Sequence, residues 1–299
     1  MGEAFECPTR PLLRWLGGKF RLAPWVVSHF PEHRQYVEPF GGAGSVLLHK
    51  PRAYNEIYND LDGELVNLFR VLRSDDAPEL LRLLELTPYS RAEYQAAFAP
   101  ADDPIERARR TVVRSHMAHG TGGARIDRPT GFRSDGISGT TNVAGEWADL
   151  PAALQAVIER MRGVTIEQKP ALELLERFNA PSIMIYLDPP YLPATRSTKS
   201  RKPGERYHTY AFEMGIEDHL LMLDACRRSE AMIVLSGYPD PLYDSQLPGW
   251  TRREIAARAH RNSPRTECLW INPPAADALE ISEPTLFPVS TISTPTGAA

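Results

Sequence analysis

Four consecutive residues after a predicted buried strand carry the clearest chemistry in this sequence. The near-continuous apolar run 183–187 is typical of a strand buried on both faces, and Asp188, Pro189, Pro190 and Tyr191 follow it directly. The prolines cannot extend a sheet ladder, so a carboxylate and a free carbonyl are held at the strand end. Tyr191 adds a flat ring. Two acceptors and a stacking ring suit the exocyclic amine of a planar base, and a proline turn that only ends the strand is the alternative.

A glycine-rich turn between a predicted strand and a predicted helix is the second feature with chemical meaning. Its residues are Glu38, Pro39, Phe40, Gly41, Gly42, Ala43, Gly44 and Ser45. Glycines in such a turn permit positive φ and let the backbone approach a ligand closely, although a tight turn without a ligand also explains them. Leu47 occupies the place of the third glycine in the G-x-G-x-x-G pattern of dinucleotide sites, so a hydride-transfer site is disfavoured.

Asp60 supports a ligand at this turn. It ends the next predicted strand, 18 residues after Gly42, which is about the spacing at which a carboxylate reaches ribose hydroxyls in doubly wound nucleotide sites. We therefore expect a nucleoside pocket between the turn and Asp60. Asp62 and Glu64 are nearby alternatives, but acidic residues at the start of a predicted helix more often interact with the helix dipole.

Two further groups of residues allow both a functional and a structural interpretation. The segment Trp15, Leu16, Gly17, Gly18 and Lys19 could equally be a helix start with a surface lysine. His116 and His119 have the spacing of a metal pair, but no third ligand lies near them in the sequence. We therefore expect surface or DNA-facing histidines and no metal.

Alternating strands and helices position these residues, which predicts an α/β fold. Strands are expected at 36–40, 56–60, 183–187, 232–235 and 268–271, and helices at 45–49, 61–72, 78–86, 105–118, 151–162 and 217–228. No clear strand signal interrupts residues 89–162, so we predict one sheet domain, 1–75 and 165–274, with a mostly helical insert at 76–164. Residues 275–299 are rich in Pro, Thr and Ser, which predicts a flexible tail.

Composition adds a protein class and an indication of partners. The chain has 299 residues, is 42% hydrophobic and lacks an apolar stretch long enough for a membrane helix, so we expect a cytoplasmic globular protein. The net charge is −4, yet 29 of the 34 basic residues are arginines, which suit phosphates and guanine edges. A GC-rich genome accounts for much of this bias. Cys7, Cys226 and Cys268 are widely spaced, which predicts reduced thiols.

In this order and at these distances, the segments resemble the Dam-like class of DNA adenine methyltransferases of bacteria and phages. Residues 15–19 resemble the W-x-G-G-K motif of that family, 38–44 its methionine-binding loop, and Asn59 with Asp60 its ribose-binding acid. Residues 188–191 match its D-P-P-Y catalytic motif, and 236–238 and 267–272 resemble its closing strand motifs. The resemblance covers 12–272 and implies a Rossmann-like methyltransferase sheet with the insert as target-recognition domain.

The resemblance implies an S-adenosylmethionine site and double-stranded DNA as the substrate. The implied cofactor-binding residues are Trp15, Lys19, Glu38, Phe40, Gly42, Gly44, Asp60 and Asp188. The implied catalytic residues are Asp188, Pro189, Pro190 and Tyr191, and the candidate DNA contacts are Arg109, Arg110, Arg125, Arg128 and Arg133. Residues 119–125 keep the family's base-reading arginine but lack the aromatic-Asn-Gly stretch found in relatives that recognise GATC, so no target sequence is implied.

Adenine N6 is a poor nucleophile because its lone pair is delocalised into the ring. We expect Asp188 and the carbonyl of Pro189 to hold the amino hydrogens, and Tyr191 to stack on a base flipped out of the duplex. The alternatives are methylation of cytosine N4, an RNA base or a glutamine side chain, and a non-catalytic DNA-binding protein on the same scaffold. Asp188 rather than Asn or Ser favours adenine, and the intact Asp60, Asp188 and Tyr191 favour an enzyme.

Overall fold

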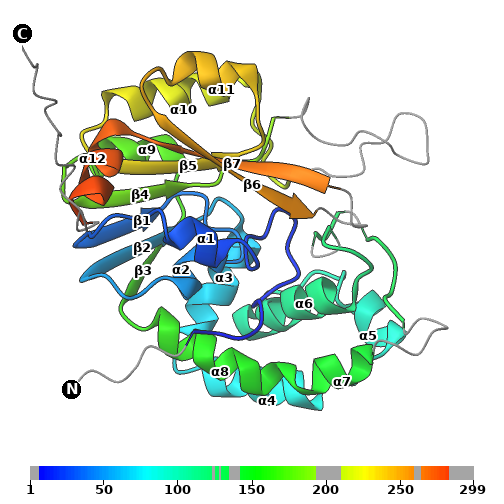
Figure 1. Cartoon of the computed structure of the whole chain (residues 1–299). Coiled ribbons are helices and arrows are strands. Elements are labelled where there is room, and N and C mark those ends of the chain that lie inside the picture. Colours follow the sequence, from blue (N-terminus) through cyan, green and yellow to red (C-terminus); the bar gives the residue numbers. More distant parts are fainter. Residues whose placement is uncertain are drawn as a thin grey trace, which may run out of the picture.

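A seven-stranded sheet forms the centre of the computed structural model, which describes residues 7–122, 125–127, 129–134, 142–192, 210–258 and 264–282. The strand order is β3-β2-β1-β4-β5-β7-β6 (Figure 1). The strands are β1 (Gln35–Glu38), β2 (Asn55–Asn59), β3 (Val164–Glu167), β4 (Ile183–Leu187), β5 (Met232–Gly237), β6 (Thr251–Arg258) and β7 (Pro264–Ile271). Strands β1 to β5 are parallel, whereas β7 runs antiparallel to β5 and β6. The expected α/β class is confirmed.

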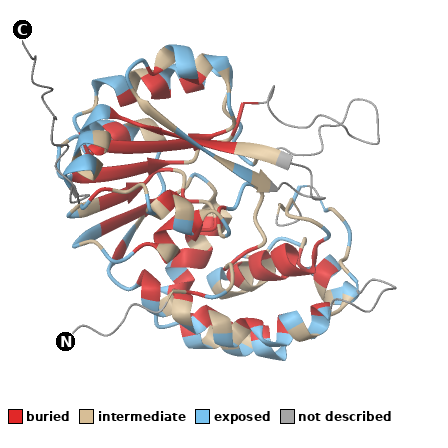
Figure 2. Ribbon diagram, in the orientation of Figure 1, coloured by how far each residue is buried: buried red, intermediate tan, exposed pale blue. Residues whose placement is uncertain are grey.

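Helices cover both faces of the sheet because its central strands are apolar on both sides. In β4, Met184 and Tyr186 belong to one buried cluster, and Ile183, Ile185 and Leu187 belong to the other. Helices α1 (Ala23–Val27), α2 (Ser45–His49), α3 (Gly63–Leu72) and α12 (Pro273–Ser282) contribute to the first cluster. Helices α9 (Ala171–Arg177), α10 (Ile216–Arg228) and α11 (Pro241–Gln246) contribute to the second. Figure 2 shows the buried strands between these helical layers.

The described part of the connection from α3 to β3 is mostly helical, as expected. Its described residues form α4 (Ala77–Leu86), α5 (Arg91–Ala96), α6 (Pro104–Met117), α7 (Val143–Ala148) and α8 (Leu150–Met161). Helix α6 packs along α3, and α4 and α8 also contact α3. Leu80, Val112 and Leu154 from these helices lie in the same buried cluster as the first sheet face. The core of the helical segment is therefore continuous with the core of the sheet.

The helix starts follow side chains that cap free backbone N–H groups. Asp62 precedes α3 and accepts a hydrogen bond from the backbone N of Glu64, and Asp103 precedes α6 and accepts one from Glu106. Pro104, the first residue of α6, has no N–H that would need a partner. No helix in the described part of the chain is long and apolar enough to cross a membrane.

The flexible tail expected from residue 275 was wrong in its first part, because residues 273–282 form α12. Asn272 anchors this helix to the sheet. Its Oδ1 accepts hydrogen bonds from the backbone N atoms of Ile233 at 2.8 Å and Ala275 at 3.1 Å, and its Nδ2 donates to the carbonyl of Ala231 at 2.7 Å. Ala275 is fully buried. Residues 283–299 lie outside the described part of the chain.

Candidate functional site

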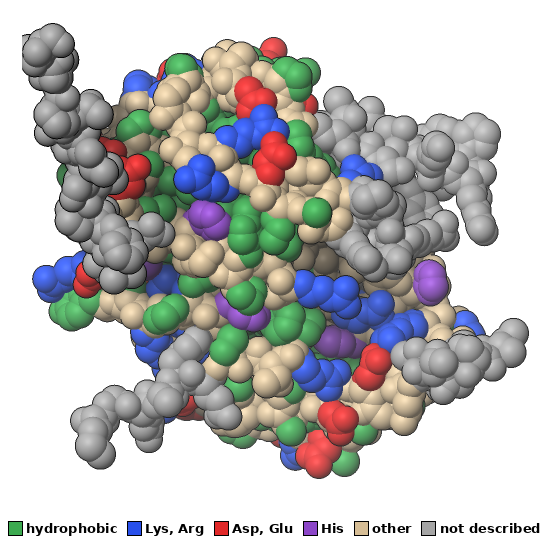
Figure 3. Space-filling model, in the orientation of Figure 1, with side chains coloured by type: hydrophobic (Ala, Val, Ile, Leu, Met, Phe, Trp, Pro, Cys, Tyr) green, Lys and Arg blue, Asp and Glu red, His purple; other side chains and the backbone are tan. Residues whose placement is uncertain are grey.

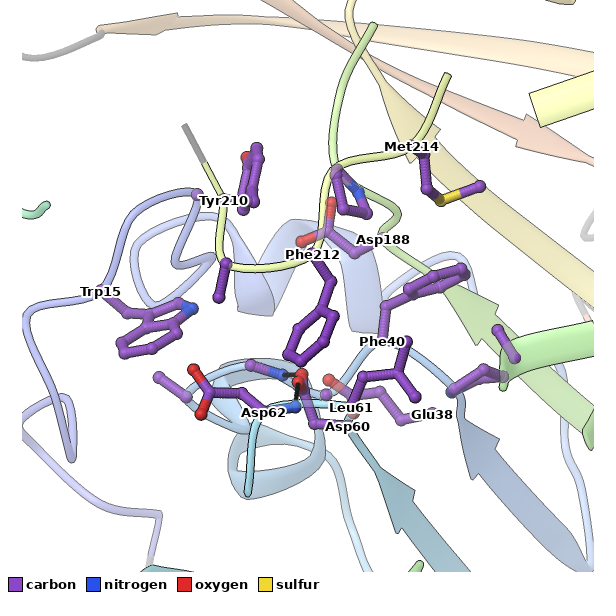
Figure 4. A pocket seen from close by; sticks show the side chains of 18 of the residues that line it. Trp15, Glu38, Phe40, Asp60, Leu61, Asp62, Asp188, Tyr210, Phe212 and Met214 are labelled. Carbon is purple, nitrogen blue, oxygen red and sulfur yellow. Dashed lines mark hydrogen bonds between the residues drawn. The ribbon is translucent and has the colours of Figure 1, made fainter. Parts of the chain in front are cut away.

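A cavity of about 550 Å³ lies where β1, β2 and β4 end. Because these strands are parallel, Glu38, Asp60 and Asp188 meet at one edge of the sheet, which is where ligands bind in open α/β sheets. Aromatic side chains share the lining with carboxylates (Figure 4). The labelled examples are Trp15, Phe40, Tyr210 and Phe212, together with Glu38, Asp60, Asp62 and Asp188. The volume lies within the range of small-molecule sites.

Asp60 fixes the glycine turn at the cavity wall. Its Oδ2 accepts a hydrogen bond from the backbone N of Gly42, and its Oδ1 accepts one from the backbone N of Asp62, both at 2.8 Å. Gly42 has a φ of +50°, and a β-carbon at Gly41 would clash with the ring of Tyr58, so both positions need glycine. Burial raises the pKa of Asp60 to about 6, although these backbone donors favour its ionised form.

Glu38 is a buried acid whose charge depends on its surroundings. Its Oε2 accepts hydrogen bonds from the hydroxyl of Tyr36 at 2.8 Å and from the backbone N of Leu47 at 3.0 Å. Burial raises the pKa of Glu38 to about 8, against the effect of these two donors. A cation bound in the cavity would therefore favour ionisation of Glu38.

Lys19 and Asp188 form a buried ion pair. The ammonium of Lys19 donates to Oδ1 and Oδ2 of Asp188 at 2.9 and 2.8 Å, and the hydroxyl of Ser236 donates to Oδ1 at 2.8 Å. The side chains of Lys19 and Asp188 are 5% and 16% exposed. Burial acts to lower the pKa of Lys19, but attraction to Asp188 and Glu267 outweighs burial and places the pKa above its usual value. Lys19 is therefore a cation of the site and not a surface lysine.

Tyr191 is held at both its ring and its hydroxyl. The hydroxyl donates to Oε2 of Glu267 at 2.8 Å. The ammonium of Lys19 lies 4.7 Å from the ring centroid, and the ring of Tyr238 packs edge-on at 4.5 Å. Tyr191 is 6% exposed, and its stacking on a flipped base stays a prediction.

Most of the expected cofactor residues line the cavity, and Gly44 does not appear among them. The lining includes Trp15, Lys19, Glu38, Phe40, Gly42, Asp60 and Asp188, together with Pro190 of the tetrapeptide that is expected to be catalytic. Pro189 is buried next to it. Gly44 has a φ of +68°, and a β-carbon there would lie 3.0 Å from the ring of Phe69. Gly44 therefore serves the packing of the turn on α3.

Several residues of the site were not expected from the sequence as functional side chains. Tyr210, Phe212 and Met214 line the cavity from the segment before α10 (Figure 4). Ser236 and Glu267 lie in β5 and β7, inside segments that were noted only as closing strand motifs. Ser236 had a signal, a polar residue at the end of an apolar run, whereas Glu267 follows Arg265 and Thr266 and does not stand out in its strand.

Arg109 and Arg110 are bound within the helical segment. Arg109 donates to Glu106 at 2.6 and 2.8 Å and to Glu93 at 3.0 Å. Arg110 donates to Glu106 at 2.6 Å and to the carbonyls of Ala99 and Pro100. Hydrogen bonding to Arg109 lowers the pKa of Glu106 to about 2. These arginines tie α5 and the following turn to α6.

Arg125 links the loop after α6 to the cavity wall. It pairs with Asp127 and donates to the carbonyl of Tyr210. Arg133 donates to Glu146 at 2.8 Å, and Arg128 lies outside the described residues. Figure 3 shows several Lys and Arg side chains together where the N-terminal segment passes α6. DNA contact by Arg125, Arg128 and Arg133 stays a prediction.

His116 is buried, whereas a surface or DNA-facing position was expected. Its Nε2 lies 3.0 Å from the carbonyl O of Leu12, and burial lowers its pKa to about 4. His119 is exposed. Within the described ranges, no group of three or more His, Cys, Asp or Glu residues is arranged to hold a metal ion.

Comparisons with known proteins agree with this geometry. A family model described as D12 class N6 adenine-specific DNA methyltransferase matches residues 15–229. A DNA adenine methylase of Salmonella typhi is 27% identical over 221 residues, which cover 71% of this chain and 74% of that protein. A DNA adenine methylase of Escherichia coli K12 is 25% identical over 221 residues, with coverage of 71% and 74%. One of Vibrio cholerae is 38% identical over 66 residues, or 22% of this chain and 24% of that protein.

The resemblance inferred from the motif segments is thereby confirmed, and with it an enzyme that methylates adenine N6 in DNA. The chain belongs to the D12 class of N6 adenine-specific DNA methyltransferases.

Proposed function

We propose that this chain binds S-adenosylmethionine in the cavity and transfers the methyl group to N6 of an adenine in double-stranded DNA. The observation that carries the proposal is an acidic, partly aromatic cavity with Asp188 in its wall. Asp188 thus belongs both to the cavity and to the tetrapeptide that is expected to hold the target base.

The lining fits the charge of S-adenosylmethionine, which carries a sulfonium and an ammonium group beside its nucleoside. Acidic side chains outnumber cations in the described lining, where Asp60, Asp62, Asp188, Glu213 and Asp218 accompany Lys19, and Glu38 can ionise beside a bound cation. An anionic dinucleotide would be repelled by this lining. Trp15, Phe40 and Phe212 offer faces for an adenine ring, and Gly42 lets the backbone approach the ligand. A carboxylate has about four acceptor sites, so Asp60 keeps capacity for ribose hydroxyls.

The residues of this chain orient the acceptor amine. The bound cofactor supplies an electrophilic methyl group. Asp188 and the carbonyl of Pro189 accept hydrogen bonds from the N6 amino group, which favours tetrahedral nitrogen in the transition state. Lys19 and Ser236 hold the carboxylate of Asp188 in place before the base arrives. Tyr191 packs beside the base and limits its tilt.

The DNA side of the site is assigned to residues 76–164 as the target-recognition segment. Its loop after α6 carries Arg125 and Arg133, and Arg125 already contacts the cavity wall through Tyr210. An arginine in such a loop can form two hydrogen bonds to a guanine edge. Because N6 is inaccessible to this cavity inside a duplex, the adenine must be flipped out.

Mass spectrometry of nucleosides tests the proposal. The purified chain is incubated with unmethylated duplex DNA, and in parallel with RNA, each with and without S-adenosylmethionine. We expect N6-methyladenine in the DNA only when the cofactor is present. Asp188→Ala should abolish the product, whereas Asp75→Asn, an exposed acid in the α3–α4 turn, should leave it unchanged. N4-methylcytosine would overturn the assignment of adenine as the target base. Methylated RNA with unmodified DNA would overturn the assignment of DNA as the substrate.

A further inference from the structure

Glu267 is a buried carboxylate that shares one face of its strand with Arg265 and with the apolar Leu269 and Ile271. It lies on β7, and Leu269 and Ile271 on its side of the strand belong to the cluster that includes α1, α2 and α3. Glu267 is 9% exposed. Burying a carboxylate costs several kcal/mol unless hydrogen bonds and opposite charges compensate it. The partners of Glu267 therefore indicate what this carboxylate does.

Those partners belong to the catalytic centre. The hydroxyl of Tyr191 donates to Oε2 of Glu267 at 2.8 Å, across 76 residues of sequence. Lys19 and Arg265 stabilise its negative charge, whereas burial and Asp188 disfavour it. Through this hydrogen bond, Glu267 connects the hydroxyl of Tyr191 to the antiparallel strand β7.

The two other interactions described for Tyr191 are less directional than the hydrogen bond of its hydroxyl. The prolines at 189 and 190 restrict the backbone before Tyr191, but they do not set its side-chain torsions. The ammonium of Lys19 over the ring and the edge of Tyr238 are contacts with broad angular tolerance. A hydrogen bond at the hydroxyl, the atom farthest from the backbone, limits the swing of the ring most effectively.

We propose that Glu267 is a positioning residue for methyl transfer, which accepts the hydroxyl of Tyr191 and thereby fixes the ring against which the target adenine packs. The inference rests on the proposed function. A misaligned base reduces the rate of transfer more than it reduces cofactor affinity, because Glu267 itself does not line the cavity. The effect should therefore appear in kcat and in the affinity for DNA, and leave the KM for S-adenosylmethionine nearly unchanged.

Two substitutions separate the hydrogen bond from the charge. Glu267→Gln removes the charge but keeps an oxygen that accepts the Tyr191 hydroxyl, so kcat should stay within about threefold of wild type. Glu267→Asp keeps the charge but withdraws the acceptor by one methylene, so kcat should fall about tenfold or more, as expected for loss of a hydrogen bond to a charged group. The kcat of the Tyr191→Phe variant should fall by the same factor. The double variant Tyr191→Phe with Glu267→Asp should be no slower than either single variant.

The assay is transfer of radiolabelled methyl groups from S-adenosylmethionine to genomic DNA that lacks N6-methyladenine. Glu254→Ala, an exposed acid on the neighbouring strand β6, is the matched control and should behave as wild type. If Glu267→Asp is faster than Glu267→Gln, or if its effect adds to that of Tyr191→Phe, the inference is overturned. If wild type itself transfers no methyl group to adenine, the proposed function fails instead.

Discussion

Replacing Lys19 by methionine removes the ammonium that holds Asp188 and keeps a side chain of similar length. Asp188 then loses two hydrogen bonds, at 2.9 and 2.8 Å, and keeps the one from Ser236. The carboxylate is left in a site where its side chain is 16% exposed. We expect both a lower free energy of unfolding and a slower methyl transfer, because the same contact stabilises the fold and orients the acceptor.

The magnitude follows from the burial of the pair. Removing one partner of a fully buried ion pair costs about 3 to 5 kcal/mol, because the other charge loses its compensation. Water reaches part of Asp188 and replaces part of the lost interaction, so the expected loss for Lys19→Met is about 2 to 4 kcal/mol. The pKa of Lys19 lies above its usual value, so its stabilising contribution is fully present at neutral pH and is lost only as strongly alkaline pH deprotonates it.

Urea unfolding followed by circular dichroism measures this loss. Lys169→Met is the control, because Lys169 forms an exposed pair with Glu173 at 3.9 Å and should change stability by less than about 1 kcal/mol. Adding Asp188→Asn to Lys19→Met should recover part of the loss, since no unpaired charge remains. A loss below about 1 kcal/mol for Lys19→Met, or strictly additive effects in the double variant, would refute a stabilising interaction between Lys19 and Asp188.

Three further predictions address the cofactor, the pH dependence and the DNA contacts. Asp60→Ala should weaken S-adenosylhomocysteine binding about ten- to a hundredfold by calorimetry, and full affinity would contradict the ribose assignment. With a pKa of about 8, folded Glu38 holds its proton where the unfolded chain has lost it, so unfolding free energy should fall as pH rises from about 4.5 to 8. Glu38→Gln should reduce this pH dependence of the unfolding free energy, measured by urea titrations at several pH values. An unchanged pH dependence would contradict the raised pKa of Glu38. Arg125→Ala should reduce discrimination between target and altered sites by about 1 to 3 kcal/mol, whereas Arg109→Ala should leave the salt dependence of DNA binding unchanged. Unchanged discrimination in Arg125→Ala, or a weaker salt dependence in Arg109→Ala, would contradict these assignments.

The central strands could be predicted from the sequence, whereas the edge strands could not. Strand β4 is buried along its whole length and therefore reads as an apolar run. Strands β3 and β6 are the two edges of the sheet, and β6 contains Arg252, Arg253 and Glu254. Charged residues are common on edge strands because they oppose pairing with other chains. The same charges remove the apolar alternation by which a strand is recognised.

The expected acidic residues of the site lie together because each lies at the carboxyl end of a strand in the parallel part of the sheet. Because β1, β2 and β4 are parallel neighbours, the residues at their carboxyl ends meet at one cavity, where the family resemblance had implied Glu38, Asp60 and Asp188. The contacts of Lys19 and Glu267 depend on where the loop before α1 and the antiparallel strand β7 lie relative to the carboxyl ends of the parallel strands. The positions of this loop and of β7 have no local sequence signal, so the partners of Lys19 and Glu267 became known only from the structure.

The hydrogen bonds of the two principal carboxylates indicate that the site is organised before any ligand binds. Asp60 is held by backbone donors from Gly42 and Asp62, and Asp188 is held by Lys19 and Ser236. A carboxylate that is already oriented loses little conformational freedom when a ribose hydroxyl or an amino group reaches it. Electrostatic stabilisation of a transition state is largest when the stabilising groups need no reorganisation at the moment of reaction. We therefore expect the buried ion pair and the capped glycine turn to contribute to catalysis through the rigidity that they give to the acceptors, in addition to their contribution to the stability of the fold.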